Sequence, residues 1–545
     1  MATATTTLVG KASIKGTSEV GRMILLNFCA IGISFTWIVE MTYCTPYLLN
    51  LGLTKSNTSL IWIAGPLSGL LVQPIIGVIA DENTSKWGRR RPFMVIGALI
   101  VACCLLVLGF TKELVGLAVR DEAVARAPTM ALAILSIYVL DFAINAIMSC
   151  SRSLVVDVLP LEKQQAGAAW ANQMGALGSI LSYSLGALNL PRILGPTLGV
   201  SQFQQLTVIA VVAVLSTTGV TCWAVNESIL VSSRGSKKTQ STYGILRQIY
   251  LTVRHLPPRI RAICWAQFWS WIGWFPFMFY STTWVGETYF RYDVPAETRQ
   301  SKDVLGEMGR IGSSALVLYS TITCAGAFVL PIFVKSPEEE RRYTARPPRA
   351  VAGLLKTLQE MRPDLLSVWI FGHLMFAGTM IFAPFATSFR FATILVCLCG
   401  IPQTIANWAP PALLGVEVNK MSSTRSRRLS QDADMELSAL EGAPSPSNLL
   451  LGNDDDSKAT SGAELSGIYF GILNIYTTIP QFIGSLIAAV VFAMLEPGKS
   501  RELTGGQPKG GLPKAEGPNA IAVCLFIGAI CAFGASFATM KLKRL

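Results

Sequence analysis

The chain has 545 residues, of which 51% are hydrophobic and only 14% are charged. This apolar content excludes the soluble domains that the length alone would suggest and indicates a membrane protein with many spans. The net charge of +12 does not indicate nucleic-acid binding, because the basic residues lie mostly in loops between apolar segments.

Apolar segments of about 20 residues, each long enough to cross a bilayer, occur twelve times. They cover residues 23–44, 58–80, 92–111, 129–152, 166–188, 204–225, 261–284, 311–334, 365–387, 390–412, 465–494 and 518–540. Twelve spans place both ends of the chain on one side of the membrane. Most of the loop arginines and lysines fall on that same side, so the positive-inside rule predicts that both termini are cytoplasmic.

A basic loop at about 226–260 divides the predicted spans six and six. Two six-helix halves around a midplane cavity are the plan of a major-facilitator transporter, with binding between the halves. We therefore predict an all-α polytopic membrane protein with the major-facilitator fold. Its parts are a cytoplasmic tail at 1–22, an N-terminal half at 23–225, the cytoplasmic loop at 226–260, a C-terminal half at 261–540 and a cytoplasmic tail at 541–545.

The first span carries Glu40 in its outer half, in a run that ends at Pro46. Acids inside membrane spans are rare because an ionised carboxylate in lipid is costly. Glu40 is therefore either a second protonatable site or a structural acid near the outer end of the helix.

The second span ends at Asp81, and a short loop follows with Arg89, Arg90 and Arg91. Small residues along this span allow close helix packing. Asp81 faces the arginines across the tight loop, so together they could form a latch that holds one conformation. The alternative is that the arginines only anchor the loop on the cytoplasmic side.

The fourth span contains Asp141 near the middle of an apolar run, where a carboxylate costs roughly 2.5–3.5 kcal/mol on insertion scales. Asn145 lies one helical turn further, and Arg152 lies eleven residues further at nearly the same angle around the helix. Acid, amide and guanidinium therefore share one face. Asp141 is either a proton carrier or a structural ion-pair partner, and Arg152 is either a functional cation or a helix-end anchor.

Further polar and aromatic residues within the spans are candidates for binding a sugar. Sugar rings stack on aromatic faces, and their hydroxyls need convergent amides and charges. The candidates are Asn172, Gln173, Trp274, Asn474 and Gln481. The alternatives are hydrogen bonds between helices for the amides and a lipid-facing or interfacial position for the aromatic ring.

A segment at 418–464 lacks apolar periodicity and is rich in Ser, Pro, Gly and charged residues, so we predict a disordered cytoplasmic loop. Arg427, Arg428 and Ser430 within it form a weak motif for a basophilic kinase. The twelve cysteines and two histidines show no metal-ligand spacing, and no nucleophile–base pattern or phosphate loop occurs. We expect neither an enzyme nor a cofactor other than a coupled proton.

Two motifs around the second loop resemble the sucrose/proton symporter family, in the glycoside–pentoside–hexuronide branch of the major facilitator superfamily. They are Gly-Pro-x-Ser-Gly-Leu-x-Val-Gln-Pro at 65–74 and Gly-Arg-Arg-Arg-Pro-Phe at 88–93. The resemblance continues through Leu-Asp-x-x-x-Asn at 140–145, Trp-Phe-Pro-Phe at 274–277, Gly-Ile-Pro at 400–402 and Gly-Ile-Leu-Asn at 471–474. The long segment at 418–464 is similar to that of fungal members.

The resemblance implies proton-coupled uptake of sucrose or of α-glucosides such as maltose. It also implies that Asp141 carries the proton and that Asn145 and Arg152 contact the sugar or assist coupling. Plant members carry two acids around the tryptophan that ends the seventh span, where this chain has Ser281 and Thr283. Glu287 is the nearby acid that remains, and we include it among the candidate sugar contacts.

The function we predict is proton-coupled symport of sucrose or maltose-type α-glucosides by alternating access. An uncoupled sugar facilitator and a sugar-sensing receptor on a transporter fold are the alternatives. The expected partners are a disaccharide and the lipid bilayer, without nucleic acid and with a cytoplasmic kinase at Ser430. We favour the plasma membrane over the vacuolar membrane, and the sequence leaves the preference between sucrose and maltose open.

Overall fold

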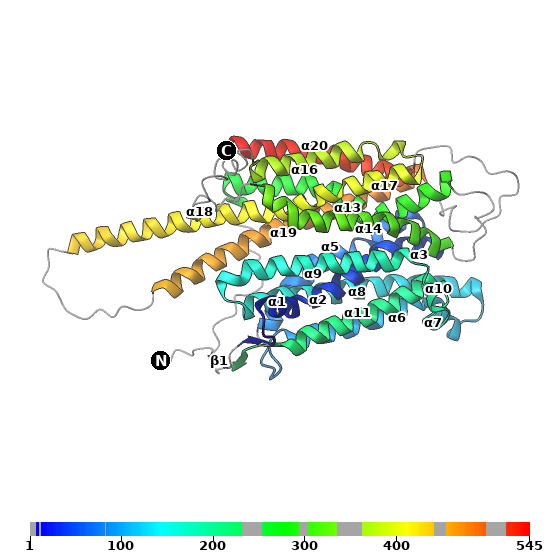
Figure 1. Cartoon of the computed structure of the whole chain (residues 1–545), viewed down its shortest axis with the longest axis horizontal. Helices are drawn as coiled ribbons and strands as arrows, with labels where there is room; N and C mark the ends of the chain where they lie inside the picture. Colours follow the sequence, from blue (N-terminus) through cyan, green and yellow to red (C-terminus); the bar gives the residue numbers. More distant parts are fainter. Residues whose placement is uncertain are drawn as a thin grey trace, which may run out of the picture.

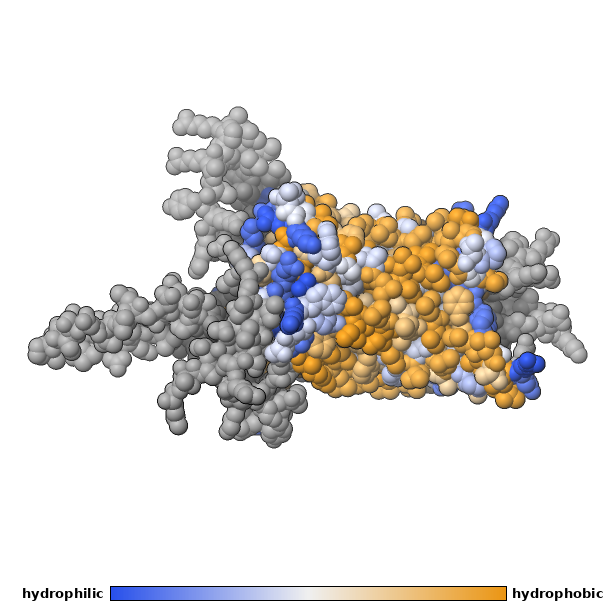
Figure 2. Space-filling model, turned by 90° about the horizontal axis from the view of Figure 1, so that it is seen from below, coloured by the Kyte–Doolittle hydropathy of each residue, from blue (hydrophilic) through white to orange (hydrophobic). Residues whose placement is uncertain are grey.

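The computed structural model describes residues 7–9, 12–81, 83–231, 253–293, 304–334, 362–440, 454–496 and 519–545. Helices cover all the predicted apolar segments, and ten helical stretches are long and apolar enough to cross a membrane. The two others, α9 (Leu161–Ala187) and α13 (Pro258–Thr288), are as long but contain more polar residues or tryptophan. An apolar band, orange in Figure 2, separates two polar ends of the bundle. The protein is therefore an all-helical, multi-pass membrane protein.

The helices before residue 225 pack on one another and form what we call the N-terminal set. Its first span is continuous but contains a π-helical turn. The elements are α1 (Glu19–Asn27), α2 (Cys29–Val39), the π-turn η1 (Glu40–Cys44), α3 (Thr45–Asn50), α4 (Lys55–Ile61), α5 (Ala64–Asp81), α6 (Arg91–Gly109), α7 (Thr111–Ala118), α8 (Glu122–Val158), α9, α10 (Leu190–Leu194) and α11 (Gln202–Ala224).

The helices after residue 257 form the C-terminal set, which lies above the N-terminal set in Figure 1. It begins with α13 and its π-helical extension η2 (Tyr289–Asp293). The other elements are α14 (Val304–Phe333), α16 (Leu365–Met380), the 3₁₀ turn η5 (Ala383–Phe385), α17 (Phe389–Leu398), α18 (Gly400–Leu440), α19 (Asp454–Leu495) and α20 (Ala520–Arg544).

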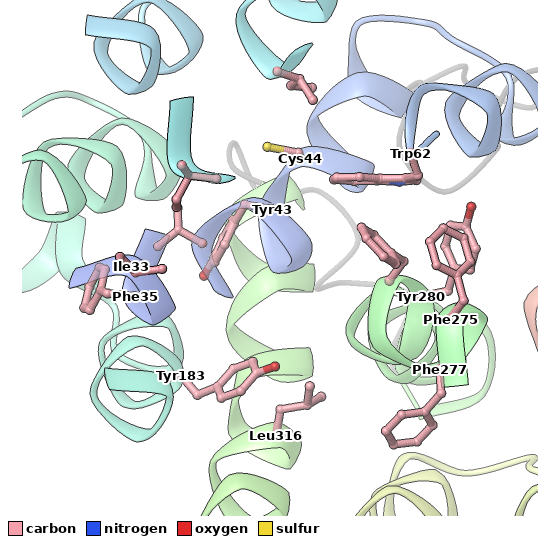
Figure 3. Packing of buried hydrophobic residues seen from close by; sticks show 14 of the residues in the cluster. Ile33, Phe35, Tyr43, Cys44, Trp62, Tyr183, Phe275, Phe277, Tyr280 and Leu316 are labelled. Carbon is pink, nitrogen blue, oxygen red and sulfur yellow. The ribbon is translucent and has the colours of Figure 1, made fainter. Parts of the chain in front are cut away.

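The two ends of the bundle differ in how the sets meet. We call them the Lys55 end and the Arg89 end, after the residue that begins the second span, α4–α5, and a residue that follows it. Towards the Lys55 end, apolar residues of both sets belong to one buried cluster, which includes Trp62, Tyr280 and Leu316 (Figure 3). Near the Arg89 end, the C-terminal set has a separate apolar cluster of its own. The sets are therefore packed together most extensively at the Lys55 end.

Glycines bring helices into close contact within each set. A Cβ atom added at Gly178 of α9 would lie 2.4 Å from the carbonyl oxygen of Ile31 in α2. One added at Gly273 of α13 would lie 2.6 Å from the carbonyl oxygen of Gly528 in α20. Small residues at such crossings are the usual means of tight packing in lipid, where no hydrophobic effect drives helices together. Each set is consequently a compact unit.

Short strands occupy the Arg89 end. Strand β1 (Thr7–Val9) pairs antiparallel with β4 (Ile229–Val231), and β2 (Ser13–Ile14) pairs with β3 (Val225–Asn226). The N-terminal segment is thereby attached to the chain that leaves α11. The start of α1 and the end of α20 lie at this same end of the bundle (Figure 1).

The segment 418–464 differs from its prediction of disorder. Helix α18 continues to Leu440 and α19 begins at Asp454, so both helices extend beyond the bundle at the Arg89 end (Figure 1). Between 418 and 440 the sequence has no glycine or proline and is rich in helix-compatible charged residues, which explains the continuation. Residues 441–453 and the side chain of Ser430 lie outside the described residues, and neither the structure nor the comparisons with known proteins support a kinase there.

Candidate functional site

Asn145 joins α8 to α5 through its side-chain amide. Its Nδ2 atom donates to Ser68 Oγ at 2.7 Å and to the backbone oxygen of Asp141 at 3.0 Å. Gln73 Nε2 donates to Asn145 Oδ1 at 3.0 Å. The amide is 3% exposed, so these hydrogen bonds fix its orientation within the N-terminal set.

Asp141 lies one turn from Asn145 and is 1% exposed. Neither carboxylate oxygen of Asp141 has a hydrogen-bond partner among the described residues. The same holds for both carboxylate oxygens of Glu40, which is also 1% exposed. The two side chains are close enough for their charges to repel each other. The structure therefore brings together two of the residues that the sequence predicts for proton coupling.

The helix geometry at Glu40 is unusual, because Glu40 begins the π-helical turn η1. Pro46 follows that turn and has no N–H to continue the normal hydrogen-bond pattern. Single π-helical turns inside α-helices occur often at functional sites. The side chain of Glu40 is buried and lies near enough to Asp141 of α8 for the two charges to interact.

Arg152 lies about 16 Å along α8 from Asp141, at the helical rise of 1.5 Å per residue. Its side chain is exposed in the described structure. No ion pair between Arg152 and Asp141 is formed in the described part of the chain.

The amides predicted to bind sugar differ in whether their side chains form hydrogen bonds within the protein. Gln481 Nε2 donates to the backbone oxygen of Thr477 at 3.1 Å, within its own helix. Asn172 in α9 and Asn474 in α19 are exposed, and Gln173 is half-buried. Among the described residues, the side chains of those three form no hydrogen bond, so their polar groups are available to a ligand.

Trp274 lies inside the C-terminal set and is 2% exposed. Its ring centroid is 4.2 Å from that of Phe376 in α16 and 5.5 Å from that of Phe277 in α13. In this conformation aromatic neighbours cover the indole. Trp265 and Trp269 of the same helix are exposed, as expected for rings that face lipid.

The arginines at the Arg89 end are paired within the N-terminal set. Arg89 and Arg90 both contact Asp157 of α8, at 3.0 and 3.1 Å. Glu227, which follows α11, accepts hydrogen bonds from the backbone N–H groups of residues 89, 90 and 91 at 2.7, 2.8 and 2.9 Å. It therefore caps the first turn of α6, where an anion is favoured. The side chain of Asp81 lies outside the described residues, so its part in the predicted latch stays a prediction.

Glu287, a predicted sugar contact, lies in a charged cluster at the Lys55 end. Lys55 Nζ is 2.6 Å from Glu287 Oε1 and 2.5 Å from Glu496 Oε2. Arg291 Nη2 is 2.7 Å from Glu496 Oε1, and Asn519 Nδ2 donates to Glu287 Oε2 at 3.0 Å. We call these five residues the Lys55 cluster. Sequence reasoning missed Lys55, Arg291, Glu496 and Asn519, because each lies at the edge of an apolar segment where a polar residue is ordinary.

Glu496 lies directly after the candidate span that ends at Leu495. Burial would raise the pKa of its carboxyl group. The ammonium of Lys55 and the guanidinium of Arg291 outweigh that effect and lower the pKa to about 2. Glu496 therefore stays ionised through the whole physiological pH range.

Comparisons with known proteins agree with this architecture. A sequence profile for the family described as MFS/sugar transport protein matches residues 27–294. The general alpha-glucoside permease of Schizosaccharomyces pombe is 28% identical, over 94% of this chain and 92% of that protein. Sucrose transport protein SUC4 of Arabidopsis thaliana is 27% identical, over 74% of this chain and 79% of that one.

Solved structures show the same fold at low sequence identity. The nucleoside transporter NupG is 11% identical with a TM-score of 0.52, over 96% of this chain and 99% of that one. A bacterial homologue of the human lysosomal transporter Spinster is 13% identical with a TM-score of 0.52, over 97% and 98% of the two chains. At these identities the solved structures show the fold, and the profile and the two relatives show that the chain is similar to MFS/sugar transport proteins, which are transporters and not enzymes.

Proposed function

We propose that this protein carries sucrose or a maltose-type α-glucoside across the plasma membrane together with a proton. The observation that supports this most directly is the pair of buried carboxylates, Glu40 and Asp141, without a hydrogen-bond partner among the described residues. An ionised carboxylate buried without a cation or donor is costly, and binding of a proton removes its charge. The permease and sucrose-transporter relatives support the substrate class.

The topology we propose has twelve spans in two six-helix halves, with both termini in the cytoplasm. The ten candidate spans, together with α9 and α13, supply the twelve. The common position of the start of α1 and the end of α20 agrees with it. In this orientation the Lys55 end is extracellular and the Arg89 end, with its arginines, is cytoplasmic.

Transport follows alternating access between the two sets. With the extracellular end open, Asp141 takes up a proton and sugar binds between the sets, contacting Arg152 and the amides Asn172, Gln173, Asn474 and Gln481. The neutralised, loaded protein then opens to the cytoplasm, where Asp141 releases its proton. One charge moving through about 100 mV supplies about 2.3 kcal/mol, which supports a roughly 50-fold sugar gradient.

The test is uptake of labelled sucrose and maltose into proteoliposomes with an acidic exterior. In Asp141→Asn, proton-driven accumulation should fall at least about tenfold, while exchange of internal for external sugar persists. Asp121→Asn is the matched control, because Asp121 is an exposed acid that caps the same helix and asparagine caps equally well. It should transport normally.

Three other outcomes of this uptake experiment would contradict the proposal. Unchanged accumulation by Asp141→Asn would contradict the proton-carrier role. Sugar flux that moves no protons in the unmodified protein would indicate a facilitator. Sugar binding without flux would indicate a sensor.

A further inference from the structure

We propose that Lys55 is the residue that holds the extracellular end of the transport path closed, by bridging carboxylates of the opposite set. This inference rests on the proposed function, since it assigns a gate to a protein that moves a solute. Lys55 is a positioning residue here: it fixes the relative position of the two sets and does not contact the sugar.

The geometry joins three segments through one ammonium group. Lys55 begins α4 of the N-terminal set, whereas Glu287 lies in the last turn of α13 and Glu496 follows α19 in the C-terminal set. Arg291 of η2 joins the cluster through Glu496. Lys55 Nζ contacts Glu287 at 2.6 Å and Glu496 at 2.5 Å. Within the described cluster, Lys55 is thus the one charge that the N-terminal set supplies.

Because these charged groups are buried, the stability of each charge depends on its ion-pair partners. The side chains of Lys55 and Glu287 are 4% and 0% exposed. A surface ion pair contributes little, but removal of one partner from a buried pair leaves an uncompensated charge and is strongly unfavourable. Two ammonium or guanidinium groups face two carboxylates, so the closed cluster is neutral. The sets can separate here only if water replaces Lys55 at both acids.

The charged cluster lies within a wider contact between the sets at the same end. Ser56 Oγ donates to the backbone oxygen of Ala489 in α19 at 2.9 Å. Trp62, which follows α4, packs on Phe279 of α13 with ring centroids 4.7 Å apart. Among the described residues, ion pairs join the two sets at this end alone. Loss of Lys55 should therefore favour the state that is open to the outside.

Arg291 cannot replace Lys55 in this role. Arg291 and Glu496 both belong to the C-terminal set and contact each other at 2.7 Å. They stay together when the sets part. Within the cluster, the two contacts that must break on opening are the ones made by Lys55.

The experiment measures how fast a cysteine beneath the gate reacts with an externally added, membrane-impermeant maleimide. Thr283 is suitable because it is buried and lies one helical turn before Glu287. Its labelling is expressed relative to a cysteine at Leu117, which is 86% exposed at the same end. The parent chain with Thr283 measures the reaction of the native cysteines, which is subtracted.

The variant Lys55→Met in the Thr283→Cys chain should label at least about fivefold faster than Thr283→Cys alone. Lys55→Arg keeps the positive charge and should restore slow labelling. The double variant Lys55→Met with Glu287→Gln keeps the cluster neutral, and it therefore guards against loss of folding. It should also label faster, because nothing then links the two sets through this pair.

Equal labelling of the double variant and Thr283→Cys would overturn the proposal. Sugar exchange, measured on the same preparations, separates this result from failure of the proposed function. Faster labelling in a protein that moves no sugar would support the gate and contradict the transport function. Normal sugar exchange with unchanged labelling would support the transport function and contradict the gate.

Discussion

The two charged clusters at the ends of the second span differ in what they connect. At the Arg89 end, Arg89 and Arg90 contact Asp157, and Glu227 caps α6, all within the N-terminal set. At the Lys55 end, one lysine joins that set to two acids of the other. Internal pairs hold a set together as it moves, whereas pairs between the sets must break when the sets separate. The same interaction thus serves a rigid unit at one end and a gate at the other.

The largest effect we predict on stability is at the Arg89 end. Glu227→Ala removes the acceptor of three backbone N–H groups and leaves Arg91, 3.6 Å away, without this acid. We expect a loss of about 2–4 kcal/mol, since charged hydrogen bonds of partly buried groups are lost. The melting temperature of the purified protein in detergent should fall by several degrees.

Glu227→Gln is the control for this change, because it keeps one oxygen acceptor. Its melting temperature should lie between those of Glu227→Ala and the unmodified protein. Lys55→Met should melt closer to the unmodified protein, since both sets remain internally intact and opening at this end lets water reach the acids that lose Lys55. If Lys55→Met destabilised the protein more than Glu227→Ala, the distinction between an internal cluster and a gate would fail.

A smaller effect should follow from a steric change at the Lys55 end. A Cβ atom added at Gly309 of α14 would lie 2.2 Å from Cε1 of Tyr43 in η1, and that ring is buried. The Gly309→Ala variant should therefore push the sets apart. We expect about threefold faster labelling of a cysteine at position 283.

Gly219→Ala is the matched control, because Gly219 also lies in a spanning helix and has no atom within 4 Å of an added Cβ. It should label at the original rate. Fast labelling in both variants would mean that added bulk loosens the bundle in general.

The sequence predicts those features of the structure that depend on a local sequence pattern. Hydrophobic length indicates where the spans lie, and helical periodicity brings Asn145 next to Asp141. The motif at 65–74 contains Ser68 and Gln73, which the structure joins to Asn145. Each of these depends on spacing within one helix or on a match to known motifs.

Contacts between distant segments could not be predicted in this way. Lys55 and Glu496 are 441 positions apart, and Glu287 and Asn519 are 232 positions apart. No periodicity relates residues across helices, so the pairing of Glu287 with Lys55 could not be predicted. Glu227 is a similar case, because its capping of α6 depends on the return of the chain after α11. The identity of such partners follows from tertiary packing alone.

The smallest effect we predict is the absence of a pH response at the gate. The pKa of Glu496 is lowered to about 2, although burial alone would raise it, because Lys55 and Arg291 stabilise its ionised form. A carboxyl group with a lowered pKa contributes fully above its ordinary pKa near 4.5, and the contribution is lost as the pH falls towards 2. Between pH 8 and pH 5 the Glu496 contribution is therefore constant. Labelling at position 283, relative to position 117, should not change over this range, whereas sugar accumulation should rise with external acidity through Asp141. If the gate opened between pH 8 and pH 5, the Lys55 cluster would respond to protonation and would not act independently of Asp141.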